Sequence, residues 1–494
     1  MTSYLVAAAF VVGLHCLYVS AVRYARLRDI EARYGGKYSH TLEERKRTGK
    51  PRMIDTYTGV RDAQRIVRLV NMYDAPYLYG KAIEFGLFKT YAIPTISSLL
   101  LATGQLSRSD NAPRRYADTA GLIQAFLTYP LPPLDFDGQD DRPDSPESWE
   151  CVGDDISDPR SAIALARMNF LHSRWNARIS NDDLLYTLSV FVVEPVSWLE
   201  RHEWRPMSRL EKEALFAMLY HVGRCMGIRD IPETYDELAA WSEAYEARHA
   251  VFAESNAQVA TYTFDLLLYH VPASLHTLGR QFAASLMDDR LRAAFAIPTP
   301  PRAVCALKDT LLWVRAMLLR YVALPRTRPL SNLPLGCEND GGEFSIERAL
   351  QASLGVCPAS GALASAGKTC PVGGHGTEAA LGAASGAGVW RMEQKWYENQ
   401  PIYSRPFAKG SLGWLLETIK VRAGLLAEED RRGSSKWRAA TLPQQPQGPV
   451  QGLGGFRLEE MGPQGLESKG REQVLRNAEE LLGRPLAGPW AFSA

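Results

Sequence analysis

Apolar residues recur at three- and four-residue spacing between about residue 60 and residue 325, which is the pattern of amphipathic helices rather than strands. Three stretches in this region also begin with a Ser or Thr whose side chain can cap a helix N-terminus. These are Ser180 before the run 184–199, Ser208 before 209–226 and Thr234 before 235–249. The pattern predicts an all-α fold.

The N-terminal run from Tyr4 to Val22 contains no charged residue. As a helix rising about 1.5 Å per residue, it would cross the roughly 30 Å hydrocarbon core of a bilayer. No basic residue precedes the run, whereas arginines follow it at positions 23, 26, 28 and 33. This asymmetry favours a retained anchor with the rest of the chain in the cytosol, and a cleaved signal peptide or a buried core helix are the alternatives. His15, inside the run, is expected at a packed or interfacial position.

Composition divides the chain into five segments. We expect a luminal end with a transmembrane anchor, a cytosolic juxtamembrane segment, a large helical domain, a linker rich in Gly, Ala and Ser, and a C-terminal segment that packs on the helical domain. These segments are residues 1–22, 23–59, 60–330, 331–389 and 390–494.

Two shorter stretches have distinctive patterns. Residues 131–160 are rich in proline and acidic residues, a composition that predicts an exposed acidic loop within the helical domain. Residues 471–482 show the spacing of an amphipathic helix that ends at Gly483 and Pro485. Order is therefore expected again near the C-terminus.

Charge and cysteine content exclude several classes of protein. Lys plus Arg number 56 and Asp plus Glu number 55, so the chain has no basic field for nucleic acid. The 7 cysteines show neither a disulfide framework nor a CxxC pair, which fits a reducing compartment. Cys337, Cys357, Cys370 and His375 lack the close pairs of zinc ligands, so we interpret their surroundings as a flexible linker rather than a metal site.

Signatures of Rossmann, P-loop, α/β-hydrolase and HExxH enzymes are absent. Two polar groups lie in helical apolar runs instead: Arg115 with Thr119, which share one helix face, and His172 among aromatic and aliphatic neighbours. A neutral imidazole in such surroundings can bind iron, and an arginine on a facing helix can pair with a haem propionate. A hydrogen-bonded core histidine and a helix-surface pair of Arg115 with Asp118 are the ordinary alternatives.

At these residues the sequence resembles a known family. RRYADT, ARMNFLHSRW, ISNDDLLYTLSVFVVEPVSW, EWRPMSRLEKEA and VFAESN are similar to the MpaB-type ER-bound oxygenases of fungal meroterpenoid pathways, which share a catalytic domain with latex-clearing rubber oxygenases. The resemblance runs from the N-terminal anchor to about residue 325 and resumes in RMEQKWYENQP and from FRLEEMGP to GPWA. It implies an all-helical oxygenase with b-type haem that uses dioxygen to split a carbon-carbon double bond in a prenyl chain.

The resemblance also implies an iron ligand, which His172 matches by position. The rubber oxygenases line the haem with an Arg-x-x-Lys-Thr element, and here this element reads Arg115-Tyr-Ala-Asp118-Thr119. Since Asp118 replaces a lysine that can occupy the distal iron position, distal ligation by lysine is not expected. No glutamate stands before Arg115 at the spacing of the rubber enzymes' catalytic base, and a non-haem iron site stays open.

Six residues follow as candidates for the site. Three are expected to bind the cofactor: the iron ligand His172, Arg115 on a propionate, and Arg174. Three are expected to act in catalysis: Thr119, which would hydrogen-bond near the haem, and Asp118 and Asn169, which would steer bound oxygen or water. The implied cofactor is haem b and the implied co-substrate is dioxygen.

The expected protein is a single-pass enzyme of the ER membrane that acts on a prenylated small molecule, with other enzymes of its pathway as candidate partners. A membrane-tethered helical protein that binds a prenyl lipid without catalysis is the alternative, and iron content separates the two. A helical terpene cyclase is disfavoured, because Asn181-Asp182-Asp183 stands at a helix start without a second Asp-rich element.

Overall fold

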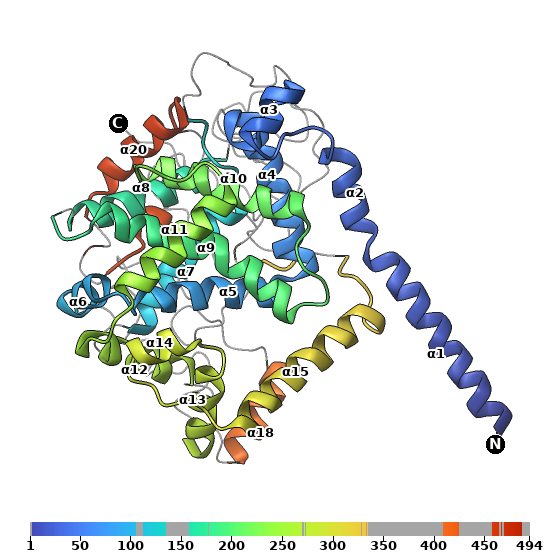
Figure 1. Ribbon diagram of the computed structural model, residues 1–494. Coiled ribbons are helices and arrows are strands. Elements are labelled where there is room, and N and C mark those ends of the chain that lie inside the picture. The colour runs from blue at the N-terminus through green and yellow to red at the C-terminus, as the bar shows by residue number, and fades with distance from the viewer. Residues whose placement is uncertain are drawn as a thin grey trace, which may run out of the picture. The chain divides into compact units, whose positions relative to one another are not determined.

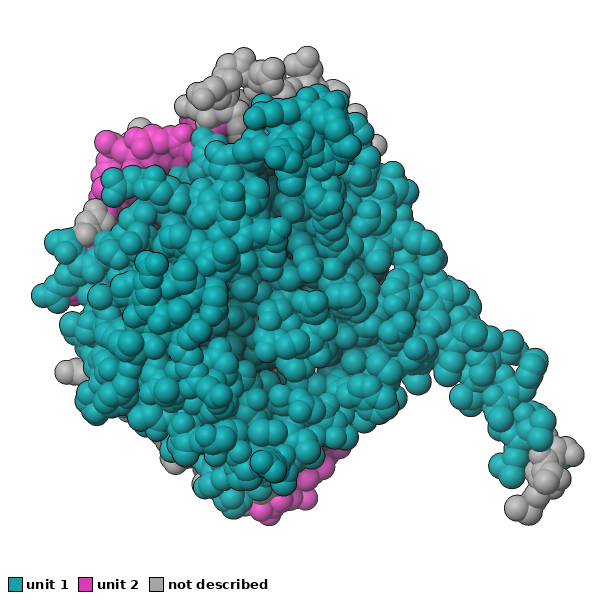
Figure 2. Space-filling model, in the orientation of Figure 1, with its two compact units in different colours: residues 1–108, 136–142, 176–330 teal, residues 109–135, 143–175, 331–494 magenta. Residues whose placement is uncertain are grey.

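The computed structural model describes residues 2–104, 112–134, 158–175, 177–268, 271, 273–327, 329–331, 333, 409–423, 457–463, 466 and 469–486. Within these ranges every regular element is a helix (Figure 1), which confirms the all-α prediction. The chain divides into two compact units, each built from separated stretches of sequence (Figure 2). Unit 1 comprises 1–108, 136–142 and 176–330, and unit 2 comprises 109–135, 143–175 and 331–494.

Unit 1 is built around α9, which packs against α5, α10, α11 and α15, while α4 packs on α10 and α6 on α12. Its elements are α1 (Thr2–Arg23), α2 (Ala25–Tyr34), α3 (Leu42–Thr48), η1 (Met53–Asp55), α4 (Tyr57–Leu69), η2 (Val70–Asp74), α5 (Pro76–Thr90), α6 (Pro94–Ala102), α9 (Asn181–His202), α10 (Arg209–Cys225), α11 (Tyr235–His249), α12 (Glu254–Leu267), η3 (Ala273–Leu275), α13 (His276–Ala284), α14 (Asp289–Ala294) and α15 (Arg302–Tyr321).

The helix starts predicted from the sequence are confirmed in unit 1. The side chains of Ser180, Ser208 and Thr234 each accept a hydrogen bond from the backbone N–H three residues further on. Glu211 bonds back to the N–H of Ser208 and completes a capping box. Each cap satisfies a backbone donor that the first helical turn cannot pair, which is why α9, α10 and α11 begin where they do.

Buried charges hold the junction between α9 and α10. Arg205 is buried, and its guanidinium lies 2.7 Å from the carboxylates of both Asp74 and Glu211. The neighbouring Trp204 is also buried and donates from its indole N–H to the backbone carbonyl of Asp74 at 3.1 Å. Since a buried charge is tolerated only with a partner, this network fixes η2 against the start of α10.

The N-terminal helix α1 is apolar and extends away from the rest of unit 1 (Figure 1). Among the described residues, Tyr4–Tyr34 is the one helical segment that contains a stretch long and apolar enough by itself to cross a membrane. Helices α5 and α6 reach the same criterion only as a pair bent by 92°. Large apolar side chains outside a core need an apolar medium, so α1 is a candidate membrane span, as predicted.

Unit 2 is centred on α8, against which α7, η5 and α20 pack. Its core combines Ala162 and Ile163 of α8 with Leu122 of α7 and Val474 and Leu475 of α20. The elements are α7 (Ala112–Thr128), α8 (Arg160–Ser173), α18 (Leu412–Arg422), η5 (Leu458–Glu460) and α20 (Arg471–Leu482). The amphipathic helix predicted at 471–482 is confirmed as α20, which ends at a left-handed Gly483.

The predicted loop and linker lie mostly outside the described residues. Residues 135–157 of the acidic loop are not described, whereas its ends are packed: Leu131 and Asp158 are buried, and Asp158 is paired with Arg160. Of the predicted linker, Leu333 is buried in the core of unit 2. The candidate metal ligands Cys337, Cys357, Cys370 and His375 are outside the described residues.

A buried arginine fixes the C-terminal segment of unit 2 on α8. Arg167 is fully buried, and its guanidinium donates to the backbone carbonyls of Met461 at 2.6 Å and of Leu466 and Lys469 at 2.8 Å each. These bonds hold the segment so close that a Cβ on Gly470 would lie 2.1 Å from the ring of Phe170. Gly470 also has a φ of 70°, a left-handed backbone that favours glycine.

We predict that Gly470→Ala destabilises unit 2 more than Gly483→Ala does. Both glycines have left-handed backbones, so either substitution costs about 1–2 kcal/mol, but only the Cβ at 470 meets another atom within 4 Å. Displacing Phe170 should add about 1–3 kcal/mol. Thermal unfolding and limited proteolysis of the detergent-solubilised full chain measure the difference. Equal losses in the two variants would contradict the close packing described at Phe170.

Candidate functional site

The six predicted site residues all belong to unit 2. Arg115, Asp118 and Thr119 lie on α7, Asn169 and His172 lie on α8, and Arg174 is the residue that caps the C-terminal end of α8. Because α7 and α8 pack against each other, the two motifs that are separate in the sequence come together.

His172 lies in the last turn of α8, and its side chain is half-buried. Desolvation by the surrounding protein, with the positive charge of Arg115 as the second cause, lowers the pKa of His172 to about 4. The imidazole is therefore neutral at physiological pH and keeps a lone pair on one ring nitrogen. Its ring forms no hydrogen bond to another residue of the described ranges. A neutral, unpaired imidazole can bind a metal ion.

Arg115 and Thr119 form one structural pair on α7. The Arg115 guanidinium donates to the Thr119 hydroxyl, and this hydroxyl donates to the backbone carbonyl of Arg115 at 2.7 Å. The ordinary role of a helical threonine, bonding to its own backbone, is thus observed here. In addition, Thr119 holds the guanidinium on the side of α7 where its charge acts on His172. This cation can pair with an anionic group placed near the imidazole.

Asp118 faces a different partner. Its carboxyl is fully buried and accepts a hydrogen bond from the backbone N–H of Gly462 at 3.2 Å. Asp118 is therefore not part of a surface ion pair with Arg115, because its side chain is buried where α7 meets the C-terminal segment. The bond from Gly462 to Asp118 attaches the C-terminal segment to α7, and the bonds from Arg167 attach the same segment to α8. A catalytic role for Asp118 stays a prediction.

The remaining two predicted residues lie on α8 and at its C-terminal end. Asn169 is half-buried in α8. Arg174 is exposed, and its guanidinium stacks over the ring of Phe170 at 5.6 Å from the centroid. The structure therefore brings Arg115, Thr119 and His172 together, whereas the roles predicted for Asn169 and Arg174 remain predictions.

The donor set limits what kind of metal group these residues can hold. In the part of the chain that the structure describes, no three His, Cys, Asp or Glu side chains gather in a way that could hold one metal ion. Among these residues, a non-haem iron site built from three such side chains is not formed. A haem needs only one protein ligand, and His172 can supply it.

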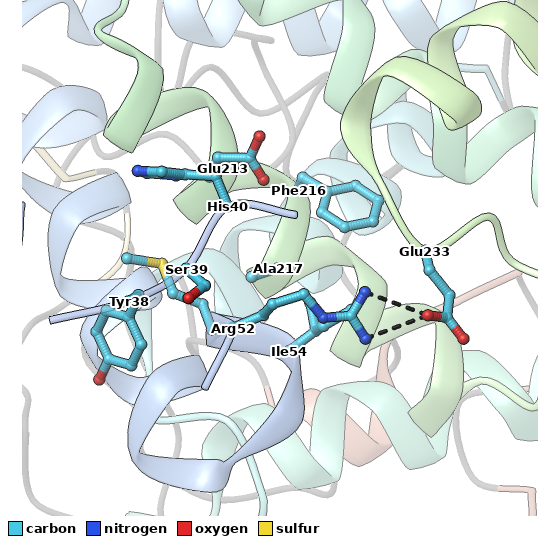
Figure 3. Close-up of a pocket in the computed structure, with 10 residues that line it drawn as sticks. Tyr38, Ser39, His40, Arg52, Ile54, Glu213, Phe216, Ala217 and Glu233 are labelled. Atoms are coloured by element: carbon cyan, nitrogen blue, oxygen red, sulfur yellow. Dashed lines mark hydrogen bonds and ion pairs between the residues drawn. The ribbon is translucent and has the colours of Figure 1, made fainter. Parts of the chain in front are cut away.

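Unit 1 contains a polar pocket that the sequence did not reveal (Figure 3). The Arg52 guanidinium crosses it and donates to the Glu233 carboxylate at 3.1 and 3.2 Å. The pocket is lined by residues from the chain before α3, from η1, from α10 and from the segment before α11: Tyr38, Ser39, His40, Arg52, Met53, Ile54, Glu213, Phe216, Ala217 and Glu233.

Two acid-base groups of this pocket have shifted pKa values. Burial raises the pKa of Glu213 from 4.5 to about 7, and burial with the charge of Arg209 lowers the pKa of His40. The sequence contained one indication that Glu213 is buried. Leu210 and Ala217, three and four residues away, lie on the same face of the predicted helix. A carboxyl that titrates near neutral pH can bind or release a proton under physiological conditions.

We predict that the pocket makes folding stability depend on pH. Between pH 4.5 and about 7, Glu213 holds a proton in the folded chain but not in the unfolded chain, so stability should fall as pH rises through this interval. Glu213→Gln should remove this part of the dependence and stabilise the protein at pH 8 by about 1–3 kcal/mol.

Thermal unfolding in detergent at a series of pH values is the measurement. The control is Glu43→Gln, which changes an exposed glutamate and should leave the pH dependence as in the wild type. An unchanged pH dependence in Glu213→Gln would show that this carboxyl ionises in the folded chain as it does in water.

Comparison with known proteins gives a consistent assignment. A family model described as the catalytic domain of ER-bound oxygenase mpaB/B' and rubber oxygenase matches residues 160–316. ER-bound oxygenase mpaB' of Penicillium brevicompactum is 32% identical over 336 residues, which cover 65% of this chain and 70% of that protein. ER-bound oxygenase mpaB of Penicillium roqueforti (strain FM164) is 33% identical over 303 residues, covering 58% of this chain and 89% of that protein.

A third relative, ER-bound oxygenase mpaB of Penicillium brevicompactum, is 29% identical over 336 residues. These matches confirm the resemblance seen in the sequence motifs, and the relatives' description as ER-bound agrees with the apolar α1. Membership of an oxygenase family makes the chain an oxidoreductase. The chain belongs to the family of mpaB-type ER-bound oxygenases, whose catalytic domain is shared with rubber oxygenases.

Proposed function

We propose that this protein is a membrane-anchored haem oxygenase that uses dioxygen to cleave a carbon-carbon double bond in the prenyl chain of a meroterpenoid or related intermediate. The observation that carries the proposal is His172: a half-buried, neutral imidazole without a hydrogen-bond partner in the described part of the chain, next to a cationic side chain. An imidazole in this state could hold haem iron.

The residues around His172 fit a haem in both their charge and their chemistry. His172 would hold the iron, and Arg115, fixed by Thr119, would pair with a propionate. Arg174 offers a second cation at the C-terminal end of α8. Bound haem iron supplies the binding and activation of dioxygen, while the protein supplies enclosure and orientation.

The overall reaction is balanced without a further reductant. Cleavage of one double bond by one molecule of dioxygen places one oxygen atom on each former alkene carbon and yields two carbonyl compounds. The polar groups proposed to steer oxygen or water are Asp118 and Asn169 on the two packed helices. Asp118 also holds Gly462, so its substitution should move the C-terminal segment as well as the site.

Membrane attachment suits an apolar prenyl substrate. A prenyl chain partitions into the bilayer, and α1 would keep the enzyme beside this reservoir. Arginines follow the apolar run at positions 23, 26, 28 and 33, which supports a catalytic domain on the cytosolic face of the ER. Other enzymes of the same pathway would then deliver and collect intermediates at this membrane.

We predict that His172→Ala abolishes haem binding. Wild-type protein purified in detergent should show a Soret band and one haem per chain, and the variant should lose both because no other ligand is proposed for the iron. The matched control is His249→Ala, which removes an exposed histidine of unit 1 and should leave the band unchanged. Far-UV circular dichroism verifies that both variants keep their helices.

Two outcomes would contradict this proposal. A wild-type protein without haem or iron, or a His172→Ala variant with the wild-type Soret band, would remove the role of His172. If the iron-free protein instead carried a prenyl lipid after mild extraction, the non-catalytic lipid-binding alternative would be supported.

A further inference from the structure

Helix α15 of unit 1 has an apolar stripe that faces solvent. From Leu307 to Tyr321, five exposed large apolar side chains recur at alternating steps of four and three residues, so they lie on one face of the helix, and Val322 directly after the helix adjoins this face. About half of each of these side chains is exposed, from 39% at Tyr321 to 52% at Leu311. The stripe consists of Leu307, Leu311, Val314, Leu318, Tyr321 and Val322.

The rest of α15 is attached to unit 1 by other residues. The Arg315 guanidinium donates to both carboxylate oxygens of Glu203, at the end of α9, at 3.1–3.2 Å. Val304 and Ala316 of the same helix are buried. The helix is therefore held in place while its apolar stripe remains outside the core, and a continuous apolar face of this kind marks a contact with another apolar phase.

The C-terminal end of α15 lies beside the membrane helix α1 (Figure 1). The His15 ring bonds to the backbone carbonyl of Val322 at 2.8 Å, and the Arg23 guanidinium donates to the carbonyl of Ala323. Arg26 donates to the carbonyl of Arg326 at 3.0 Å. Side chains of α1 and α2 thus bond to the backbone carbonyls that follow the last turn of α15. Without these bonds, the carbonyls would be unpaired in an apolar medium.

These contacts set the depth of α15. His15 lies about 10 Å along α1 from the charged end of the apolar run, at about 1.5 Å per residue. Arg23, at that charged end, bonds to the adjacent carbonyl of Ala323. If α1 spans the bilayer, the end of α15 therefore lies between these two levels, in the outer part of the hydrocarbon core next to the headgroups. The stripe, which ends at Val322, is thus continuous with the lipid-facing surface of α1.

On the side of α15 away from the stripe, two side chains suit the headgroup layer. Trp313 is 63% exposed, and aromatic side chains of this kind are enriched at the headgroup level. Arg320, on the same side of the helix, can reach lipid phosphates. Lys308 is instead held by the carboxylate of Asp309 at 2.7 Å, with 12% of its side chain exposed. A protein partner could also cover an apolar stripe. We favour a bilayer, because α1, the candidate membrane span, contacts the end of α15 and would bring the stripe next to lipid.

We propose that α15 is an interfacial membrane helix that lies in the headgroup layer with its stripe toward the acyl chains. The protein then has two membrane contacts, the spanning α1 and the surface-bound α15. The second contact would fix the orientation of unit 1 on the membrane, which a single flexible anchor cannot do. This inference depends on α1 as a membrane span and is independent of the haem chemistry.

Lipid photolabelling of the full-length protein tests the proposal. The protein is reconstituted into vesicles of phosphatidylcholine and phosphatidylserine that contain a phosphatidylcholine with a diazirine in its acyl chain. After illumination, mass spectrometry should find lipid adducts on α1 and on residues 307–322, and none on the exposed face of α11. Adducts confined to α1 would overturn the proposal.

A matched pair of variants sharpens this test. Leu311→Glu with Leu318→Glu should lose the adducts on α15 but keep those on α1, whereas Asp309→Asn, on another face of α15, should keep both sets. Circular dichroism verifies folding of each variant. Protein-protein crosslinks through the stripe without lipid adducts would instead identify a second copy as its partner and would also overturn the proposal.

Discussion

The guanidinium of Arg167 is buried in unit 2, and burying a charge this completely requires that all its donors be satisfied. Three backbone carbonyls between Met461 and Lys469 accept its hydrogen bonds. On the facing helix α7, the Asp118 carboxylate accepts a further hydrogen bond from the backbone N–H of Gly462. The C-terminal segment thereby becomes part of the packing of α7 and α8, and the candidate site between these helices depends on residues that lie about three hundred positions away in the chain.

The same packing explains the electrostatic state of the site. Desolvation disfavours the charged imidazole, and the nearby Arg115 disfavours it further, so His172 is held neutral. A neutral ligand and a cationic neighbour are complementary to a metal group that carries carboxylates, such as haem with its propionates. In the proposed function, one arrangement of two helices would thus prepare the iron ligand and provide a counter-ion for the haem.

Unit 1 combines buried ion pairs with surfaces that are too apolar for water. Arg205 is stable in the interior because Asp74 and Glu211 neutralise it. The stripe on α15, in contrast, has no apolar cover in the described part of unit 1, and α1 is apolar along its length. A membrane protein can keep such surfaces because lipid takes the place of a core. These two apolar surfaces fit association with a membrane.

The sequence by itself determined the helices, their caps at Ser180, Ser208 and Thr234, and the apolar anchor, because these features depend on residues only a few positions apart. Its motifs also indicated the family and the residues Arg115 and His172. Only the tertiary structure decided that Asp118 binds Gly462, that Glu213 is desolvated, and that the stripe of α15 faces outward. These outcomes depend on contacts between distant segments, and local periodicity is the same whether an apolar face meets protein, lipid or water.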